Sequence, residues 1–159
     1  MSGSRSFSTP DASETPERSE AVLSLKTVQK MLPLVKRIVE DILANHRAVL
    51  HLLPEEDRLD RQRHQLDWPG RQRRYRIKEE RAAADRNLQA NVAELHELGL
   101  VLLDESLGQI GFPTLVNNRR AYFSWHSGEE TLNTWQVADE DVQHPIPASW
   151  LKELVSANA

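Results

Sequence analysis

The sequence predicts an α+β protein in which a long antiparallel helical hairpin leads into a small, mainly antiparallel β-sheet and a short C-terminal helix. Apolar residues recur at helical spacing along two long segments that precede Gly99, and this spacing disappears after Gly99. The apolar segments that follow are short, contain aromatic and β-branched residues, and are separated by turn residues. We therefore expect residues 21–98 to form the hairpin, residues 99–145 the sheet and residues 146–159 the last helix.

A chain of 159 residues is long enough for one domain with a modest core. Its first twenty residues are rich in Ser, Thr, Pro and Glu, and Phe7 is their only aromatic residue. Such a polar segment cannot offset the entropy that is lost on ordering. We predict a disordered tail over residues 1–20 and a single domain over residues 21–159.

The first helical segment carries an apolar residue at every third or fourth position. Members of this stripe are Val28, Met31, Val35, Ile38, Ile42, Val49 and Leu52. Pro33 removes a backbone donor, so either a short turn over residues 24–32 precedes a helix that begins near Pro33, or one helix is kinked there. The stripe stops at Leu53-Pro54, and the acidic residues after Pro54 are typical of a helix first turn, which predicts a break at Pro54.

The second helical segment follows a turn that is predicted by Asp-Trp-Pro-Gly at residues 67–70. Its stripe consists of Ile77, Ala84, Leu88, Asn91, Leu95 and Leu98. Gly99 stands where a left-handed residue commonly ends a helix. Because each stripe is only two side chains wide, the hairpin alone leaves a flank of each helix exposed, and another surface must cover it.

Four strands are expected in the sheet. They span Leu100–Leu103, Gln109–Phe112, Arg120–Trp125 and Thr131–Val137. Residues 116–119 read Val-Asn-Asn-Arg and predict a hairpin turn, because Asn tolerates positive φ better than most residues. A short helix over residues 149–155 is expected to be capped by Ser149.

The composition excludes several classes of function and location. Cys is absent, which rules out disulfides, thiol nucleophiles and metal sites built on thiolates. No apolar run approaches the length of about 18 residues that crosses a bilayer, and the first twenty residues lack the apolar region of a secretory signal. We expect a soluble cytoplasmic protein without a membrane partner.

The net charge of −4 hides an asymmetry along the chain. Residues 58–86 contain ten Arg or Lys and five acidic residues, whereas residues 99–159 contain three basic and eight acidic residues. The two halves could attract each other, or a neighbouring copy could bind head to tail.

The basic residues within residues 71–78 are the best argument for nucleic-acid binding, because five cations and Tyr75 could follow a phosphate backbone. Glu79, Glu80 and Asp85 lie on neighbouring turns of the same predicted helix, where they can pair with these cations. The sequence favours a solvated, ion-paired helix face, so a nucleic-acid partner is not expected.

Five motifs of this chain together resemble the pattern of a protein family. They are Leu32-Pro33-Leu34, Leu98-Gly99-Leu100, residues 108–113, residues 124–129 and Trp135-Gln136. With them the chain resembles a bacterial family catalogued as domain of unknown function 2203. The resemblance covers roughly Leu25 to Pro145, and the motifs after Gly99 carry its specificity. It implies no activity, because the family has none assigned.

The family pattern has Asp, Cys and His where this chain has Gly111, Ser124 and Gln136. Those three replaced residue types are the ones most able to ligate a metal or move a proton. If the family site performs such chemistry, the resemblance implies that this chain has lost it. The other interpretation is that these positions only satisfy local hydrogen bonds.

The favoured hypothesis is a non-catalytic interaction module that forms a homodimer through its hairpin, as a four-helix bundle or coiled coil, with no cofactor and no metal. The alternative is a small-ligand or metal-binding protein, or an enzyme, with a pocket between the sheet and the hairpin. The candidate residues of that pocket are Asp104, Trp125, His126, Glu129 and Trp135. A weak nucleic-acid binder that uses the basic helix is a second alternative.

Two of these candidate residues have competing interpretations. His126 could ligate a metal together with Glu129 and His144, although their spacing matches no metal motif. Glu129 follows Gly128 at a predicted turn, where its carboxylate could equally accept backbone N–H groups, and this second role is the favoured one.

Overall fold

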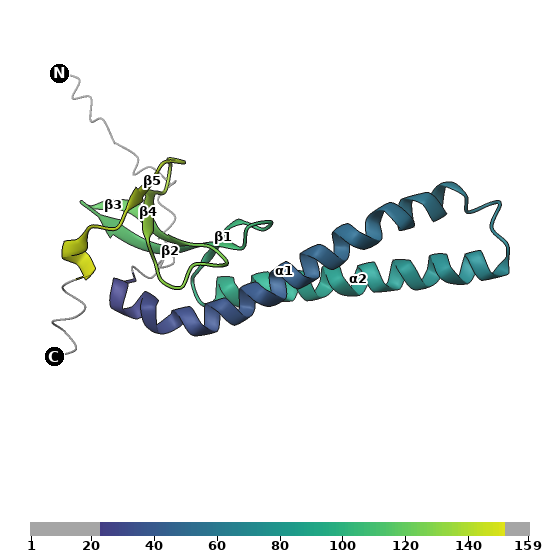
Figure 1. The fold of residues 1–159 in the computed structure, drawn as a ribbon, viewed down its shortest axis with the longest axis horizontal. Helices are drawn as coiled ribbons and strands as arrows, with labels where there is room; N and C mark the ends of the chain where they lie inside the picture. Colours follow the sequence, from purple (N-terminus) through teal and green to yellow (C-terminus); the bar gives the residue numbers. More distant parts are fainter. Residues whose placement is uncertain (1–22, 152–159) are drawn as a thin grey trace, which may run out of the picture.

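The computed structural model describes residues 23–151, and the predicted tail over residues 1–20 lies outside them. Two long helices come first, α1 (Leu25–Arg61) and α2 (Trp68–Glu97). Five strands follow, namely β1 (Val101–Asp104), β2 (Gln109–Val116), β3 (Arg119–Trp125), β4 (Thr134–Val137) and β5 (Gln143–Pro145). This order, with a short helix beginning at Ala148, confirms the predicted α+β arrangement (Figure 1).

Helix α1 is one continuous helix that contains both Pro33 and Pro54. The side chain of Ser24 caps it by accepting a hydrogen bond of 3.2 Å from the backbone N–H of Thr27. The predicted break at Pro54 is wrong. Both prolines are solvent-exposed, so water can reach the carbonyl groups that they leave without a donor. Beyond Pro54 the helix buries Leu59 against the hairpin partner, which favours its continuation.

Helix α2 begins at the predicted turn over residues 67–70, with Asp67 as its N-cap, and ends at the predicted cap Gly99. Asp67 accepts a hydrogen bond of 2.9 Å from the backbone N–H of Gly70. At the other end, Gly99 has φ +79, and the backbone N–H of Leu100 donates to the carbonyl of Leu95 at 3.0 Å. This is the Schellman arrangement, which turns the chain sharply from α2 into β1.

The sheet is antiparallel throughout and has the strand order β1-β2-β3-β4-β5. The predicted turn between β2 and β3 is confirmed, because Asn117 and Asn118 have φ values of 52 and 60. Cross-strand pairs such as Phe112 with Phe123 and Phe123 with Trp135 place these aromatic side chains on one face. That face packs on α1.

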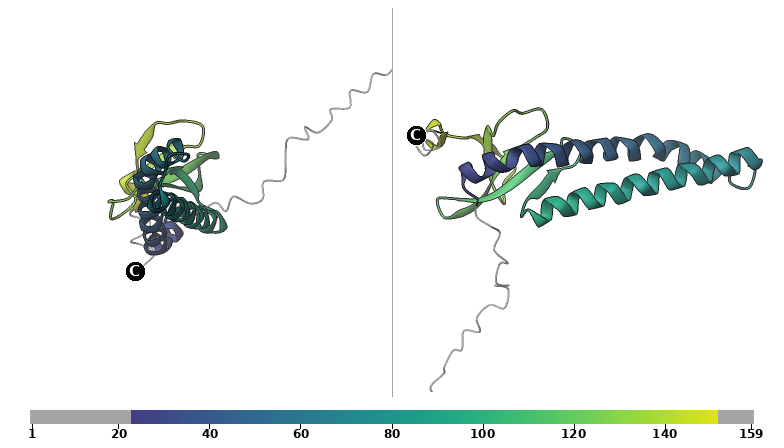
Figure 2. Two further views of the ribbon diagram at one scale, coloured as in Figure 1. Left: turned by 90° about the vertical axis from the view of Figure 1, so that its right-hand side faces the viewer. Right: turned by 90° about the horizontal axis from the view of Figure 1, so that it is seen from below.

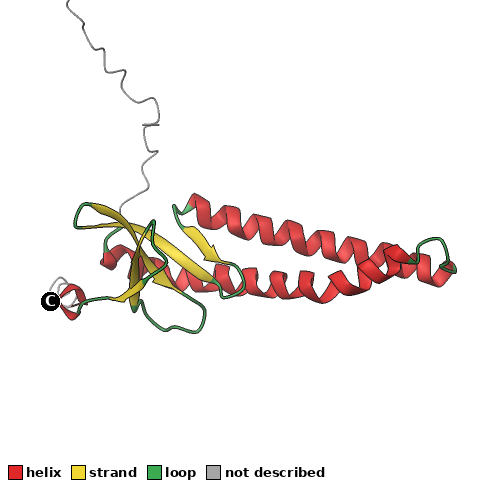
Figure 3. Cartoon of the chain, turned by 90° about the horizontal axis from the view of Figure 1, so that it is seen from above, coloured by secondary structure: helices red, strands yellow, loops and turns green. Residues whose placement is uncertain are grey.

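The core lies between this face of the sheet and the first half of α1. Val28, Val35 and Ile42 are fully buried there, together with Ile110 and Phe112. The second half of the hairpin extends beyond the sheet as a two-helix arm (Figures 1 and 2). The sheet therefore covers only part of the hairpin, and Figure 3 shows the tip of the arm far from every strand.

Other local features differ from the sequence-based expectation. The fourth strand begins at Thr134 and not at Thr131, because Asn133 leaves the strand path to bond the preceding loop. Strand β5, which contains Pro145 at the sheet edge, was not predicted. The last helix begins at Ala148, so Ser149 lies inside it, and residues 152–155 of its predicted range lie outside the described residues.

No helix within residues 23–151 is both long and apolar enough to cross a membrane.

Candidate functional site

The loop between β3 and β4 is organised around the carboxylate of Glu129, whose side chain is 14% exposed. One oxygen of this carboxylate accepts the backbone N–H of His126 at 3.1 Å and lies 3.2 Å from its ring Nε2. The other oxygen accepts the side-chain amide of Asn133 at 2.8 Å. The indole N–H of Trp125 donates to the backbone carbonyl of Glu129 at 2.8 Å. This geometry gives Glu129 the part of a turn carboxylate that holds two strand ends together.

Replacing Glu129 with alanine is expected to lower the free energy of unfolding by about 1 to 2 kcal/mol, because a largely buried carboxylate loses hydrogen bonds from two partners. Thermal or urea unfolding followed by circular dichroism measures this change. Glu130→Ala is the matched control, since Glu130 is exposed and accepts a hydrogen bond from Lys36 through its backbone carbonyl, which alanine keeps. Equal stability of the two variants would contradict the assignment.

Asp104 caps the turn between β1 and β2. Its Oδ1 accepts the backbone N–H and the hydroxyl of Ser106 at 2.9 and 2.7 Å, and the backbone N–H of Leu107 at 3.0 Å. These donors, the Ser106 hydroxyl first, hold the pKa of Asp104 below its ordinary value. The next residue, Glu105, lies 2.8 Å from Nδ1 of His46 and so links this turn to α1. The Asp104 carboxylate therefore has a structural role, because it holds the turn at the end of the sheet.

Trp135 belongs to an aromatic cluster that the sequence did not predict. Its ring centroid lies 4.8 Å from that of His144 and 5.8 Å from that of Trp150. Trp150 meets Phe123 edge to face at 6.4 Å, which fixes the start of the last helix on the sheet. The sequence signal was available, because each of these aromatic residues stands in or beside a predicted strand or helix. Their pairing depends on strand register.

The structure brings only part of the predicted pocket together. Trp125 at the end of β3 contacts the following loop, which holds His126 and Glu129. Asp104 instead caps a different turn, and Trp135 packs in the aromatic cluster. The cavities within residues 23–151 include two shallow ones over α2 and one beside Phe123 and Trp150. These five residues line none of those three cavities.

The positions at which this chain departs from the family pattern converge on the sheet face that is opposite α1. Gly111 is the cross-strand partner of Ser124, and Gln136 pairs with Tyr122 one step further along β3. A Cβ at position 111 would lie 3.0 Å from the ring of Tyr122, so that ring occupies the space of a side chain. Within residues 23–151 no three His, Asp or Glu side chains are placed to hold a metal ion.

The far half of the hairpin carries a ladder of ion pairs between the two helices. Arg73 bonds Glu55, Arg74 bonds Asp60 at 2.7 Å, and Lys78 lies 3.1 Å from the same Asp60. Hydrogen bonds from Arg74 and then Lys78 hold the pKa of Asp60 below its ordinary value.

The ladder continues where Arg81 forms two hydrogen bonds to Glu56 and a third, of 2.6 Å, to Asp85. Glu56 is buried, with a side chain that is 8% exposed. Asp85 pairs with Arg81, which lies outside the basic run of residues 71–78. The carboxylates that pair with cations of that run come from α1, which the sequence did not predict. The sequence signal for this ladder is the order of the charges, since acidic residues precede the hairpin turn and basic residues follow it.

A second group of α2 side chains faces away from α1 and forms what we name the outer face of α2. Its members are Trp68, Gln72, Tyr75, Glu79, Ala82, Ala83, Arg86, Ala90 and Ala93, which recur every three or four residues apart from the adjacent Ala82 and Ala83. Trp68 and Tyr75 are 67% and 66% exposed. Shallow cavities of 370 and 470 Å³ flank Tyr75 on its two sides.

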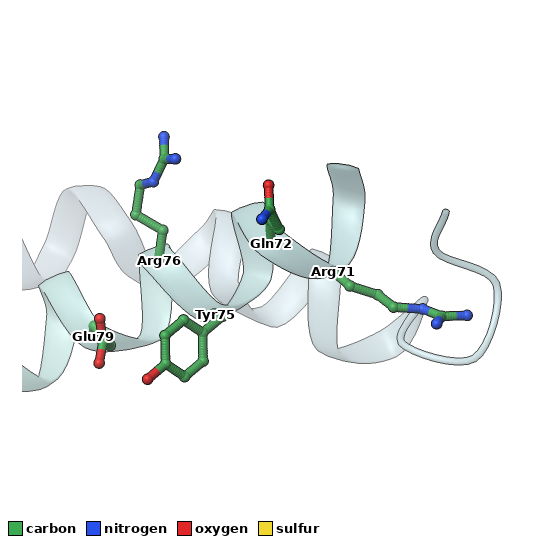
Figure 4. Close-up of a pocket in the computed structure, with 5 residues that line it drawn as sticks. All are labelled: Arg71, Gln72, Tyr75, Arg76 and Glu79. Carbon is green, nitrogen blue, oxygen red and sulfur yellow. The ribbon is translucent and has the colours of Figure 1, made fainter. Parts of the chain in front are cut away.

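Figure 4 shows the first of these cavities, in which the Tyr75 ring projects from the helix and its hydroxyl points toward Glu79. The hydrogen bond between these side chains and the charge of Glu79 raise the pKa of Tyr75. Exposed aromatic rings beside hollows are typical of protein contact surfaces. The outer face of α2 is thus suited to binding a partner.

The comparisons with known proteins agree with the motifs of the sequence. No curated protein and no solved structure matches this chain. One family does match, over residues 22–144, which is more than half of the chain and includes both helices and the first four strands. The protein belongs to the family described as "Uncharacterized conserved protein (DUF2203)".

Proposed function

We propose that this protein is a non-catalytic interaction module that forms a dimer through its helical hairpin. The observation that carries this proposal is the uncovered arm beyond the sheet, where Trp68 and Tyr75 are two-thirds exposed on the outer face of α2. Large aromatic side chains are enriched at protein interfaces because they bury much apolar area at a small entropic cost. A cytoplasmic location, as expected from the sequence, is part of the proposal.

The chemistry of the sheet end also favours a contact role. The carboxylates of Asp104 and Glu129 are engaged by donors of their own loops, so they are poorly placed to bind or protonate a substrate. Glu105 is likewise engaged with His46. These side chains stabilise the turns that connect the strands.

Light scattering on the purified full chain tests the dimer. The chain mass is 18.2 kDa, and the expected particle mass is about twice that value at micromolar concentration. A folded particle with the mass of one chain at high concentration would contradict the proposal. Because the contact is expected to be partly polar, the mass should fall toward one chain on dilution.

Nucleic-acid binding at the hairpin tip is the second candidate. Arg76 points away from the helix in Figure 4. The Arg71 guanidinium donates to the carbonyl of Leu66 at 3.2 Å, and this hydrogen bond joins it to a neutral group and not to a carboxylate. Trp68 beside them could stack on a base. Fluorescence titration with a labelled single-stranded oligonucleotide tests this function, and binding should weaken steeply with salt. Unaltered fluorescence at low salt would exclude it.

A further inference from the structure

The outer face of α2 is self-complementary about its own centre. Helix α2 spans Trp68–Glu97, so its midpoint lies between Ala82 and Ala83, which are two of the smallest side chains on this face. Resting on the proposed self-association, we propose that the partner is a second copy of this chain, held by two antiparallel α2 helices around a twofold axis at Ala82 and Ala83. The whole length of about 45 Å is then shared by both helices.

Charge complementarity argues for this alignment. Glu79 and Arg86 lie seven residues apart, which is two helical turns, and both are exposed on the same face. Around the axis, Glu79 lies opposite Arg86 of the partner subunit, and the symmetry repeats this pair on the other side. A parallel alignment in register would place each of these charges beside its own copy, where like charges repel.

Side-chain size is complementary as well. In the same alignment the ring of Tyr75 lies opposite Ala90 of the partner subunit, and Gln72 lies opposite Ala93 of the partner subunit. At the axis Ala82 lies opposite Ala83 of the partner subunit, where small side chains allow close approach of the two helices. The cavities of 370 and 470 Å³ beside Tyr75 give the side chains of a second helix room to interdigitate.

The alignment also brings oppositely charged parts of the two copies together. The tip of the hairpin, with Arg61, Arg63 and Arg71, lies at the opposite end of the molecule from the sheet, which carries most of the acidic excess (Figure 1). The fold therefore keeps these two oppositely charged regions apart within one chain. Antiparallel pairing places the basic tip of each copy beside the sheet end of the other, so the opposite charges meet between chains.

Charge reversal tests the alignment. Glu79→Arg alone and Arg86→Glu alone should each weaken dimerisation, measured by sedimentation equilibrium, by at least about tenfold, because each places two pairs of like charges across the axis. The dimerisation affinity of the double variant Glu79→Arg/Arg86→Glu should return at least half-way from that of the single variants to that of the wild type. Glu80→Arg, an exposed reversal one residue off this face, is the control and should change the affinity little.

Cysteine crosslinking gives an independent test, since the chain contains no natural cysteine. Ala82→Cys lies at the axis and should crosslink to its own copy with a short thiol reagent or on oxidation. Ala93→Cys lies on the same face but about 30 Å from its own copy, so it should stay uncrosslinked under the same conditions.

The outcomes separate this inference from the proposed function. A wild-type particle with the mass of one chain overturns both the dimer and this alignment. A wild-type dimer whose affinity ignores Glu79→Arg and Arg86→Glu, or in which Ala93→Cys crosslinks as well as Ala82→Cys, leaves self-association standing and overturns the alignment alone. Circular dichroism checks that each variant keeps its helices, as expected for exposed positions and for the half-buried Ala82.

Discussion

Replacing Ile42 with aspartate is expected to leave the protein unfolded in physiological buffer. Ile42 lies on α1 and is fully buried in the core that α1 forms with α2 and the sheet. Removing such an aliphatic side chain costs about 2 to 5 kcal/mol, and an unpaired buried charge adds several more. A single domain is usually stable by only about 5 to 15 kcal/mol, so the sum removes most of the margin.

Circular dichroism and a thermal melt measure this outcome for Ile42→Asp. Leu50→Asp is the matched control, because Leu50 lies two turns further along α1 and is 55% exposed. We expect Leu50→Asp to keep a cooperative melt close to that of the wild type. A folded Ile42→Asp protein would show that the contact between α1 and the sheet is not the core of the molecule.

Replacing Arg81 with methionine is expected to lower the free energy of unfolding by about 2 kcal/mol. The change leaves Glu56, with a side chain that is 8% exposed, without the guanidinium that accompanies it. Fully buried pairs lose about 3 to 5 kcal/mol when one partner is removed. The smaller value is expected here because the Arg81 side chain is itself 28% exposed and partly solvated.

The double variant Glu56→Leu/Arg81→Met tests the reason for that loss. It removes both charges from the hairpin, so its stability should return to near the wild-type value. Urea unfolding of the two single variants and the double variant gives the coupling energy directly. If Arg81→Met were as stable as the wild type, Glu56 would not depend on Arg81.

Features that depend on a few neighbouring residues could be predicted from the sequence. The left-handed Gly99 after α2 and the Asn117-Asn118 turn between β2 and β3 each follow from the conformational preferences of one or two residues. The apolar stripes of both helices were likewise visible, because burial on one face imposes their spacing.

Features that depend on distant contacts could not be predicted. Pro54 signals a helix break locally, yet α1 continues because Leu59 is buried and Glu56 is paired with Arg81, which is 25 residues further along the chain. The sequence favours Glu129 as a turn carboxylate, as its contacts confirm, but it places Asn133, which binds Glu129, in a strand. The sequence did not predict the outer face of α2, because its alanines and one tyrosine form no apolar stripe.

The distance between spin labels at Ala93→Cys tests the central claim most directly, because the wild-type chain offers no other thiol. The antiparallel dimer predicts one distance of about 30 Å between the helix positions of the two copies, since residue 93 lies more than ten residues from the axis. Pulsed electron spin resonance on the labelled full chain measures it. A distance near about 10 Å, as in a parallel pair of helices, or the absence of any dipolar coupling, as in a monomer, would contradict the account.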